Sequence, residues 1–146
     1  MYDTILLPTD GSEGTADAVE QAFDLAKNYD ATVHALYVID LKEVNAIEHT
    51  FDTTMYTEKF RAEGESALDE LSQRGEDAGV DVVTVIREGI PHEVILDYCD
   101  EEAVDLVVMG THGRTGLGRY LLGSVTEKVV RLSDVPVLTT RLTEAD

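Results

Sequence analysis

Cysteine, basic residues and long apolar runs are all scarce in this chain. Its single cysteine, Cys99, cannot form an intrachain disulfide, and no apolar run approaches the ~18–20 residues that a membrane helix needs. Residues 1–12 lack the basic and apolar regions of a signal peptide. These absences favour a cytoplasmic protein that does not enter a membrane. Cys99 shares an apolar helical stripe with Val94, Ile95 and Tyr98, which predicts a buried structural thiol more than a reactive one.

The chain has far fewer basic residues than acidic ones. Eleven lysines and arginines face thirty aspartates and glutamates, which gives a net charge of −19. Such a field repels nucleic acid and anionic membranes, so we expect neither as a partner. The acids are spread through every expected helix, which indicates an acidic folded surface and not a disordered tail. We hypothesise a salt-loving source, because salt screens self-repulsion of this size.

The length of 146 residues suits one domain, residues 1–146, and 43% apolar residues are enough to fill its core. Apolar runs alternate with helical stripes from end to end, which indicates a parallel α/β sheet with helices on both faces. The expected strands are Tyr2–Pro8, Ala31–Ile39, Val80–Ile86, Val104–Met109 and Val135–Leu138.

Four helices are expected between these strands. The second runs from about Thr54 to Glu76, and Gly79 closes it. Pro91 opens the third at its first turn. Residues 40–53 show no clear period and are expected to form a loop. The residues expected to mark the other two helices are Ala16, Val19, Phe23 and Ala26 in the first and Leu122, Val125, Val129 and Leu132 in the last.

Two strand ends carry unusual chemistry. In open α/β sheets, ligands bind beyond the carboxyl ends of the strands, where the strand order reverses. The first strand ends in Pro8-Thr9-Asp10-Gly11-Ser12, and the fourth ends in Gly110-Thr111-His112-Gly113. Asp10 could cap the following helix or contact a ligand, and His112 could contact phosphate or face solvent. Pro136 cannot donate to a strand ladder, so the last strand should lie at an edge or leave that position unpaired.

The segment GTHGRTGLGRYLLGS, residues 110–124, holds five of the eleven glycines. Glycine lets a ligand approach the backbone closely, and clustered N–H groups can surround an anion. Ser124 opens the last helix, where it could cap the helix or offer its hydroxyl to a ligand, and a helix N-terminus suits phosphate.

The charge of this region also favours an anionic ligand. Residues 110–131 hold four bases and one acid, a net +3, whereas the other residues carry −22 from seven bases and twenty-nine acids. A flexible loop with solvated arginines would give the same counts. Gly118-x-x-x-x-Gly123-Ser124 has part of the P-loop spacing, but serine stands where that motif has lysine, and no G-x-G-x-x-G follows the first strand.

The glycine spacing fits another pattern. Gly110-x-x-Gly113, nine residues and then Gly123-Ser124 resembles the G-x2-G-x9-G-[S/T] motif of the universal stress protein family. The resemblance covers nearly the whole chain, from the opening ILLPTDGSE through Tyr37-Val38-Ile39-Asp40 to the closing Val135-Pro136-Val137-Leu138.

This resemblance implies a five-stranded parallel sheet of order 3-2-1-4-5 that binds ATP or another adenine nucleotide, with magnesium or manganese left open. Adenine would lie near the backbone of Val38, ribose near Asp10, and the phosphates on the glycine segment. It also implies a homodimer formed by antiparallel pairing of last strands through Val135, Val137 and Leu138. The expected ATP-binding residues are Pro8, Thr9, Asp10, Val38, Met109, Gly110, Thr111, His112, Gly113, Arg114, Gly123, Ser124 and Val125.

Three functions are then in competition. The first is a regulatory ATP-binding homodimer of the stress response, without fast chemistry, because a P-loop lysine and an evident general base are missing. The second is a slow ATPase or self-phosphorylating enzyme. The third is a dimeric interaction protein that binds no nucleotide. The four histidines have no metal-ligand spacing, and His34, within a strand, is expected to be packed. No catalytic residue is predicted.

Overall fold

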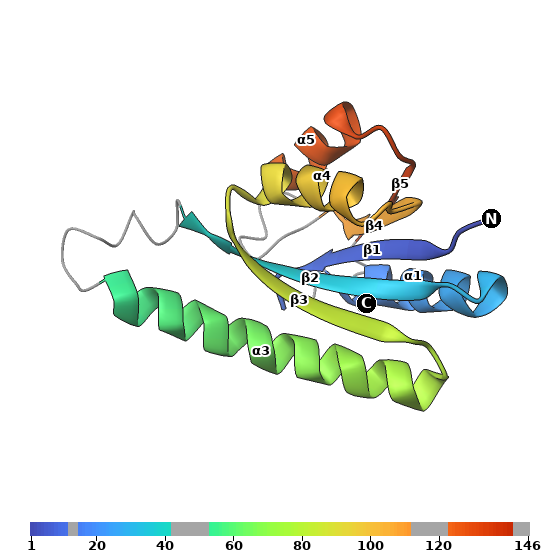
Figure 1. Cartoon of the computed structure of the whole chain (residues 1–146), viewed down its shortest axis with the longest axis horizontal. Coiled ribbons are helices and arrows are strands. Elements are labelled where there is room, and N and C mark those ends of the chain that lie inside the picture. The colour runs from blue at the N-terminus through green and yellow to red at the C-terminus, as the bar shows by residue number, and fades with distance from the viewer. Residues whose placement is uncertain (12–14, 42–52, 112–122, 142–146) are drawn as a thin grey trace.

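The computed structural model describes residues 1–11, 15–41, 53–111 and 123–141, in which strands and helices alternate (Figure 1). The alternation expected from the apolar pattern is confirmed. The elements are β1 (Thr4–Thr9), α1 (Ala16–Tyr29), β2 (Thr32–Asp40), α3 (Thr53–Ala78), β3 (Val82–Gly89), α4 (Pro91–Glu101), β4 (Leu106–Gly110), α5 (Ser124–Leu132) and β5 (Val137–Thr140).

All four strand pairings in the described sheet are parallel, in the order β3-β2-β1-β4-β5. This is the predicted order 3-2-1-4-5, and it places the reversal between β1 and β4. Four of the strands begin two residues later than expected, because Tyr2, Val80, Val104 and Val135 pack against the core ahead of the ladders.

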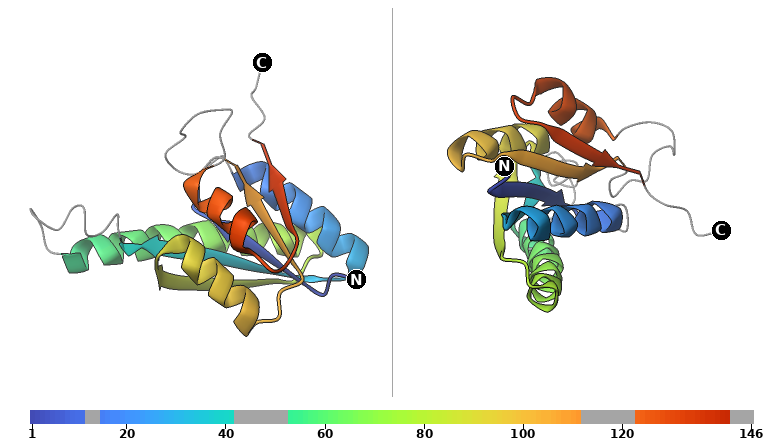
Figure 2. Two further views of the ribbon diagram at one scale, coloured as in Figure 1. Left: turned by 90° about the horizontal axis from the view of Figure 1, so that it is seen from above. Right: turned by 90° about the vertical axis from the view of Figure 1, so that its right-hand side faces the viewer.

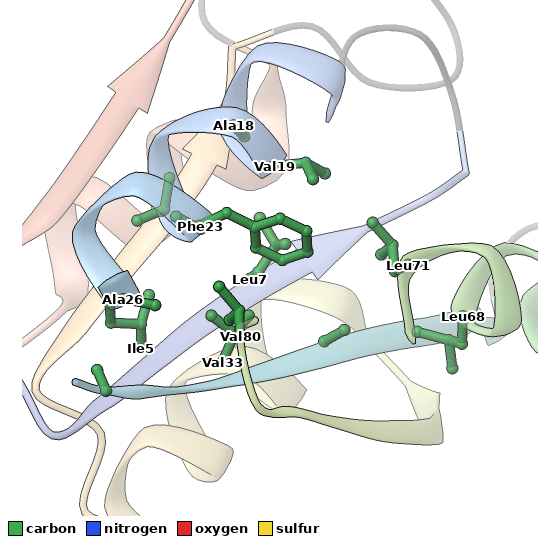
Figure 3. Close-up of a cluster of buried hydrophobic side chains, with 14 of the residues drawn as sticks. Ile5, Leu7, Ala18, Val19, Phe23, Ala26, Val33, Leu68, Leu71 and Val80 are labelled. Carbon is green, nitrogen blue, oxygen red and sulfur yellow. The ribbon is translucent and has the colours of Figure 1, made fainter. Parts of the chain in front are cut away.

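Two helices cover each face of the sheet, α1 and α3 on one and α4 and α5 on the other (Figure 2). Alternate residues of a strand point to opposite faces. In β1, Ile5 and Leu7 therefore pack with α1 and α3, whereas Leu6 packs with α4 and α5. Figure 3 shows the first of these clusters, with Phe23 of α1 beside Leu7. The central strands are buried on both faces, as the continuous apolar run of β4 predicts.

The helix ends follow local residue chemistry. Gly79, just after α3, has φ +74, a left-handed conformation that glycine adopts at little cost. Pro91 is the first residue of α4, where its missing N–H is not needed. The predicted inward face was wrong at Ala16 and Leu132, both exposed, because each is the terminal residue of its helix. Leu122 lies outside the described residues.

The start of β1 is fastened to β4 through Asp105. One carboxylate oxygen, Oδ2, accepts the backbone N–H of Asp3 at 2.8 Å and that of Thr4 at 3.0 Å. The backbone N–H of Asp105 in turn donates to the Thr4 carbonyl at 2.9 Å. These bonds extend a short ladder, in which Ile5 pairs with Leu106 and Leu6 with Val107. Asp105 therefore helps to set the register across the reversal.

The last strand lies at the sheet edge, as Pro136 predicts. Pro136 itself precedes β5, and its carbonyl accepts the N–H of Val107 at 3.0 Å. The carbonyl of the proline therefore takes part in the sheet, and the N–H group that proline lacks is not needed at this position. None of the helices in the described part of the chain is long and apolar enough to cross a membrane.

Candidate functional site

A cavity of about 260 Å³ opens at the carboxyl ends of β1, β2 and β4. This is the place that the strand-order reversal predicts for a ligand. Helices α3, α4 and α5 also contribute to its wall, so it is bordered by both layers of helices. The lining residues are Pro8, Thr9, Asp10, Thr15, Leu36, Tyr37, Val38, Ile39, Asp40, Phe60, Pro91, Ile95, Met109, Gly110, Gly123, Ser124, Val125 and Thr126.

The cavity brings together residues that are far apart in the sequence and that the sequence predicts for one site. Thr111 is buried beside Gly110 but does not line the cavity. His112, Gly113 and Arg114 lie outside the described residues. The predicted residues that do line it are Pro8, Thr9, Asp10, Val38, Met109, Gly110, Gly123, Ser124 and Val125.

The end of β1 presents Asp10 to the cavity. Thr9 is buried, and its Oγ1 accepts the backbone N–H of Gly11 at 3.1 Å, which turns the chain away from the strand. Thr15 takes the capping position of α1, which begins at Ala16, so Asp10 is not the N-cap of that helix. Among the two roles considered for Asp10, its place in the cavity favours ligand contact.

The N-terminus of α5 forms another part of the wall. Gly123 is the N-cap and Ser124 the first helical residue, so the suggested capping role of Ser124 is wrong. The first bond of the helix joins the N–H of Glu127 to the carbonyl of Gly123 at 2.9 Å. The N–H groups of Ser124, Val125 and Thr126 therefore belong to the first turn, which has no intrahelical acceptors and carries the positive end of the helix dipole.

The backbone N–H and carbonyl of Gly123 both form hydrogen bonds within the protein. Its N–H donates to the carbonyl of Thr111 at 2.7 Å, and the N–H of Thr111 donates to the carbonyl of Thr140 in β5 at 2.8 Å. Gly123 therefore joins the helix start to the end of β4, and the donors left facing a ligand are those of the residues that follow it.

Half of the lining residues were missed by the sequence reasoning. Phe60 lies on the apolar stripe of α3, a signal that indicates core packing equally well. Asp40 is the last residue of β2, and its place at the carboxyl end of a buried apolar run, like that of Asp10 after β1, is a sequence signal for the site. The missed residues are Thr15, Leu36, Tyr37, Ile39, Asp40, Phe60, Pro91, Ile95 and Thr126.

The wall of the cavity differs in chemistry from one part to another. Apolar side chains from β2, α3 and α4 form one part, among them Val38, Phe60 and Ile95. The carboxylates of Asp10 and Asp40 lie at neighbouring strand ends, and the start of α5 supplies hydroxyl and N–H groups. The described lining residues include no lysine, arginine or histidine. Such a wall suits a ligand with an apolar body, hydroxyl groups and an anionic end.

The backbone of α3 approaches the cavity wall closely at Gly64. A Cβ on this glycine would lie 2.6 Å from Cδ1 of Tyr37, a side chain of β2 that is only 2% exposed. Glycine is therefore required for the ring of Tyr37 to fit under α3. This contact positions the strand segment that forms the apolar part of the cavity.

The match to known proteins agrees with this architecture. A family model described as the universal stress protein family matches residues 1–141. The chain belongs to the universal stress protein family.

Individual members are similar over nearly the full chain. The universal stress protein MJ0531 of Methanocaldococcus jannaschii is 38% identical over 138 residues, covering 94% of this chain and 81% of that one. The solved structure of MJ0577, described as a hypothetical protein, superposes with a TM-score of 0.87 at 35% identity and 99% coverage of both chains. A universal stress protein in complex with cAMP superposes with a TM-score of 0.71 at 25% identity, covering 97% of this chain and 98% of that one.

A second polar group, away from the cavity lining, involves His34 of β2. Its Nδ1 lies 2.6 Å from the hydroxyl oxygen of Tyr98 in α4, and the guanidinium of Arg87 lies 4.8 Å from the centre of the Tyr98 ring. Arg87 also pairs with Glu101 at 2.6 Å. Burial lowers the pKa of His34, and the nearby Glu102 carboxylate opposes this only in part. His34 is thus a packed residue, as expected.

The structure also bears on a reactive cysteine and on a metal site in the described part of the chain. Cys99 lies on the buried face of α4, where burial, together with Asp100, raises the pKa of its thiol to about 11. This confirms the expected buried position and disfavours the thiolate that a reactive cysteine needs. Within the described ranges, no group of three or more histidine, cysteine, aspartate or glutamate side chains is arranged to hold a metal ion.

Proposed function

We propose that this universal stress protein binds ATP or another adenine nucleotide in the cavity and acts as a regulatory homodimer of the stress response. The observation that carries the proposal is that Asp10, Val38, Gly110 and Ser124, from four separate elements, line one cavity at the strand-order reversal. The proposed ligand contacts are those expected from the sequence, with His112, Gly113 and Arg114 included on that basis alone.

The cavity wall supports each part of such a ligand. An adenine ring buries apolar area, which suits the wall near Val38 and Phe60. Ribose hydroxyls are donors, and Asp10 offers carboxylate oxygens that accept. Phosphates favour the start of α5, where first-turn N–H groups and the helix dipole attract an anion. A magnesium or manganese ion that accompanied the phosphates would find oxygen ligands in the cavity in the carboxylate of Asp10 and the hydroxyl of Ser124.

The comparisons support the ligand class in coarser terms. One related universal stress protein, 25% identical, was solved in complex with cAMP, which is an adenine nucleotide. A single-phosphate nucleotide needs the same apolar and ribose contacts as ATP but less of the phosphate site. The preference among ATP, AMP and cAMP therefore depends on the α5 end of the cavity.

Isothermal titration with ATP and magnesium tests the proposal. We expect saturable heat from the native protein and at least about tenfold weaker binding by Ser124→Asp, because the added carboxylate repels phosphate where the helix start attracts it. Aspartate is well tolerated in a first helical turn, so the variant should fold. Ser66→Asp, which adds the same charge at an exposed position of α3, is the matched control. Absence of heat from the native protein at high concentration would contradict nucleotide binding.

The proposed dimer pairs two β5 strands. The carbonyls of Pro136 and Thr140 accept the N–H groups of Val107 and Thr111, so the backbone groups of these even-numbered residues point toward β4. In a parallel ladder this leaves the N–H of Thr139 facing outward. Thr139→Pro removes that donor, so we expect it to sediment as a monomer while the native protein sediments as a dimer. Thr139→Val keeps the donor and is the control. A native monomer at micromolar concentration would refute the pairing.

Slow hydrolysis of bound ATP is the second candidate, favoured by the carboxylate of Asp10 in the same cavity as Ser124. Phosphate release by the native protein and by Asp10→Asn separates the two functions. Release that the substitution abolishes supports an enzyme, and release that it leaves unchanged points to a contaminant.

A further inference from the structure

Thr126 is the third residue of α5 and lines the cavity. Its hydroxyl forms a hydrogen bond to a residue outside its own helix. Its Oγ1 donates to the carbonyl of Gly110, the last residue of β4, at 2.8 Å. The residue is 4% exposed. Threonine within a helix commonly donates to a carbonyl three or four residues back in that helix. Here the acceptor lies sixteen residues back, at the end of a strand.

Two hydrogen bonds join the same two elements. The first runs from the Thr126 hydroxyl to Gly110, and the second from the N–H of Gly123 to the carbonyl of Thr111. Together they fix the start of α5 against two successive carbonyls, that of Gly110 at the end of β4 and that of Thr111 just after it. The Thr126 bond is the one of the pair that a side chain makes, so the identity of the residue at 126 controls it.

We propose that Thr126 is the positioning residue of the phosphate end of the cavity. By holding the first turn of α5 against Gly110, it sets where the N–H groups of Ser124 and Val125 point. This inference rests on the proposed function, because it assigns those donors to the phosphates. The part of the wall that would face adenine belongs to β2, α3 and α4, which this bond does not touch.

This division gives a selective test with ATP and adenosine as the two probes. Thr126→Val keeps the shape of the side chain and removes the hydroxyl. We expect it to weaken ATP binding about fivefold, the loss typical of one net hydrogen bond, and to leave adenosine binding within about twofold. Thr126→Ser keeps the hydroxyl and should bind both probes like the native protein. A role limited to general packing would weaken both probes alike.

The outcomes separate this inference from the proposed function. A native protein that binds neither probe overturns the function itself. If the native protein binds ATP, two results for the valine variant overturn the role of Thr126 alone. Either the variant binds ATP as well as the native protein does, or its binding of ATP and of adenosine weakens equally. If the valine variant does not fold, the serine variant decides the question. This variant retains the hydroxyl, so a loss of the native preference for ATP over adenosine overturns the proposal. A serine variant that keeps this preference supports the proposal.

Discussion

Removal of the Asp105 carboxylate tests whether the strand-order reversal depends on a single side chain. In the structure, one oxygen of Asp105 accepts two backbone N–H groups at the start of β1, at 2.8 and 3.0 Å. Asp105→Ala leaves both donors to water, since Asp3 is exposed and Thr4 only half-buried. The ladder between β1 and β4 contains two paired positions beyond this point, so few other contacts compensate.

The expected loss follows from these two bonds. A hydrogen bond contributes about 0.5–1.5 kcal/mol net, so the pair contributes about 1–3 kcal/mol to the free energy of unfolding. For a chain of this size, each kcal/mol corresponds to roughly 2–4 °C in Tm. Asp105→Asn retains an amide oxygen as acceptor and should lose about half as much, because the charge that strengthens the bonds is gone.

Urea unfolding followed by circular dichroism measures the difference. The matched control is Asp81→Ala, which removes the same charge from an exposed position just ahead of β3. It should change stability by less than about 0.5 kcal/mol, and it corrects for the relief of repulsion in a chain of charge −19. Equal midpoints for the Asp105→Ala and Asp81→Ala variants would refute the reasoning, because the two bonds would then contribute nothing.

Three further predictions concern titration and charge. With a thiol pKa of about 11, about a thousandth of Cys99 is thiolate at pH 8, so an aromatic disulfide reagent should label it far more slowly in the native protein than in urea, and equal rates would show it to be accessible. Burial lowers the pKa of His34 in the folded state, so below the ordinary value near 6.5 the protein takes up a proton when it unfolds. The contribution of His34 to stability is therefore fully present above that pH. It is lost as the pH falls toward the folded-state pKa. His34→Gln should therefore lose less stability than the native protein between pH 7.5 and 5.5 in urea unfolding, and an identical loss would exclude His34 as a source. Finally, the charge of −19 predicts that Tm rises between 0.1 and 2 M potassium chloride, as the screening length shortens from about 10 Å toward 3 Å or less; sorbitol at equal osmolality is the control, and an equal rise in sorbitol would remove the electrostatic explanation.

The order and type of the elements were predictable because local patterns determine them. Gly79 and Pro91 mark helix ends by their own backbone preferences, and the run from Leu106 to Met109 reads as buried on both faces without any knowledge of its neighbours. The strand order was less accessible. It came from the resemblance to a family, since alternation alone gives parallel strands but no sequence of pairing.

The candidate site was predictable where its residues follow strands or contain glycine, and less so where packing selects them. Phe60 and Ile95 belong to helical stripes, and whether such a residue faces the core or a cavity depends on how far its helix extends past the sheet. Whether Asp10 and Ser124 cap a helix could not be decided from the sequence, because α1 begins later and α5 one residue earlier than these polar residues suggest. Those boundaries depend on tertiary contacts such as the bond between Gly123 and Thr111.

The cavity touches both hydrophobic clusters at once, Tyr37 and Ile39 from the α1 and α3 face and Leu36, Ile95 and Met109 from the other. A molecule held there contacts two layers that otherwise meet only through the sheet. Its binding free energy then opposes separation of either layer, by an amount that grows with the logarithm of its concentration. Amide hydrogens of α3 and of α4, the two helices that supply Phe60 and Ile95 to the cavity, would slow their exchange with solvent together, although these helices lie on opposite faces of the sheet.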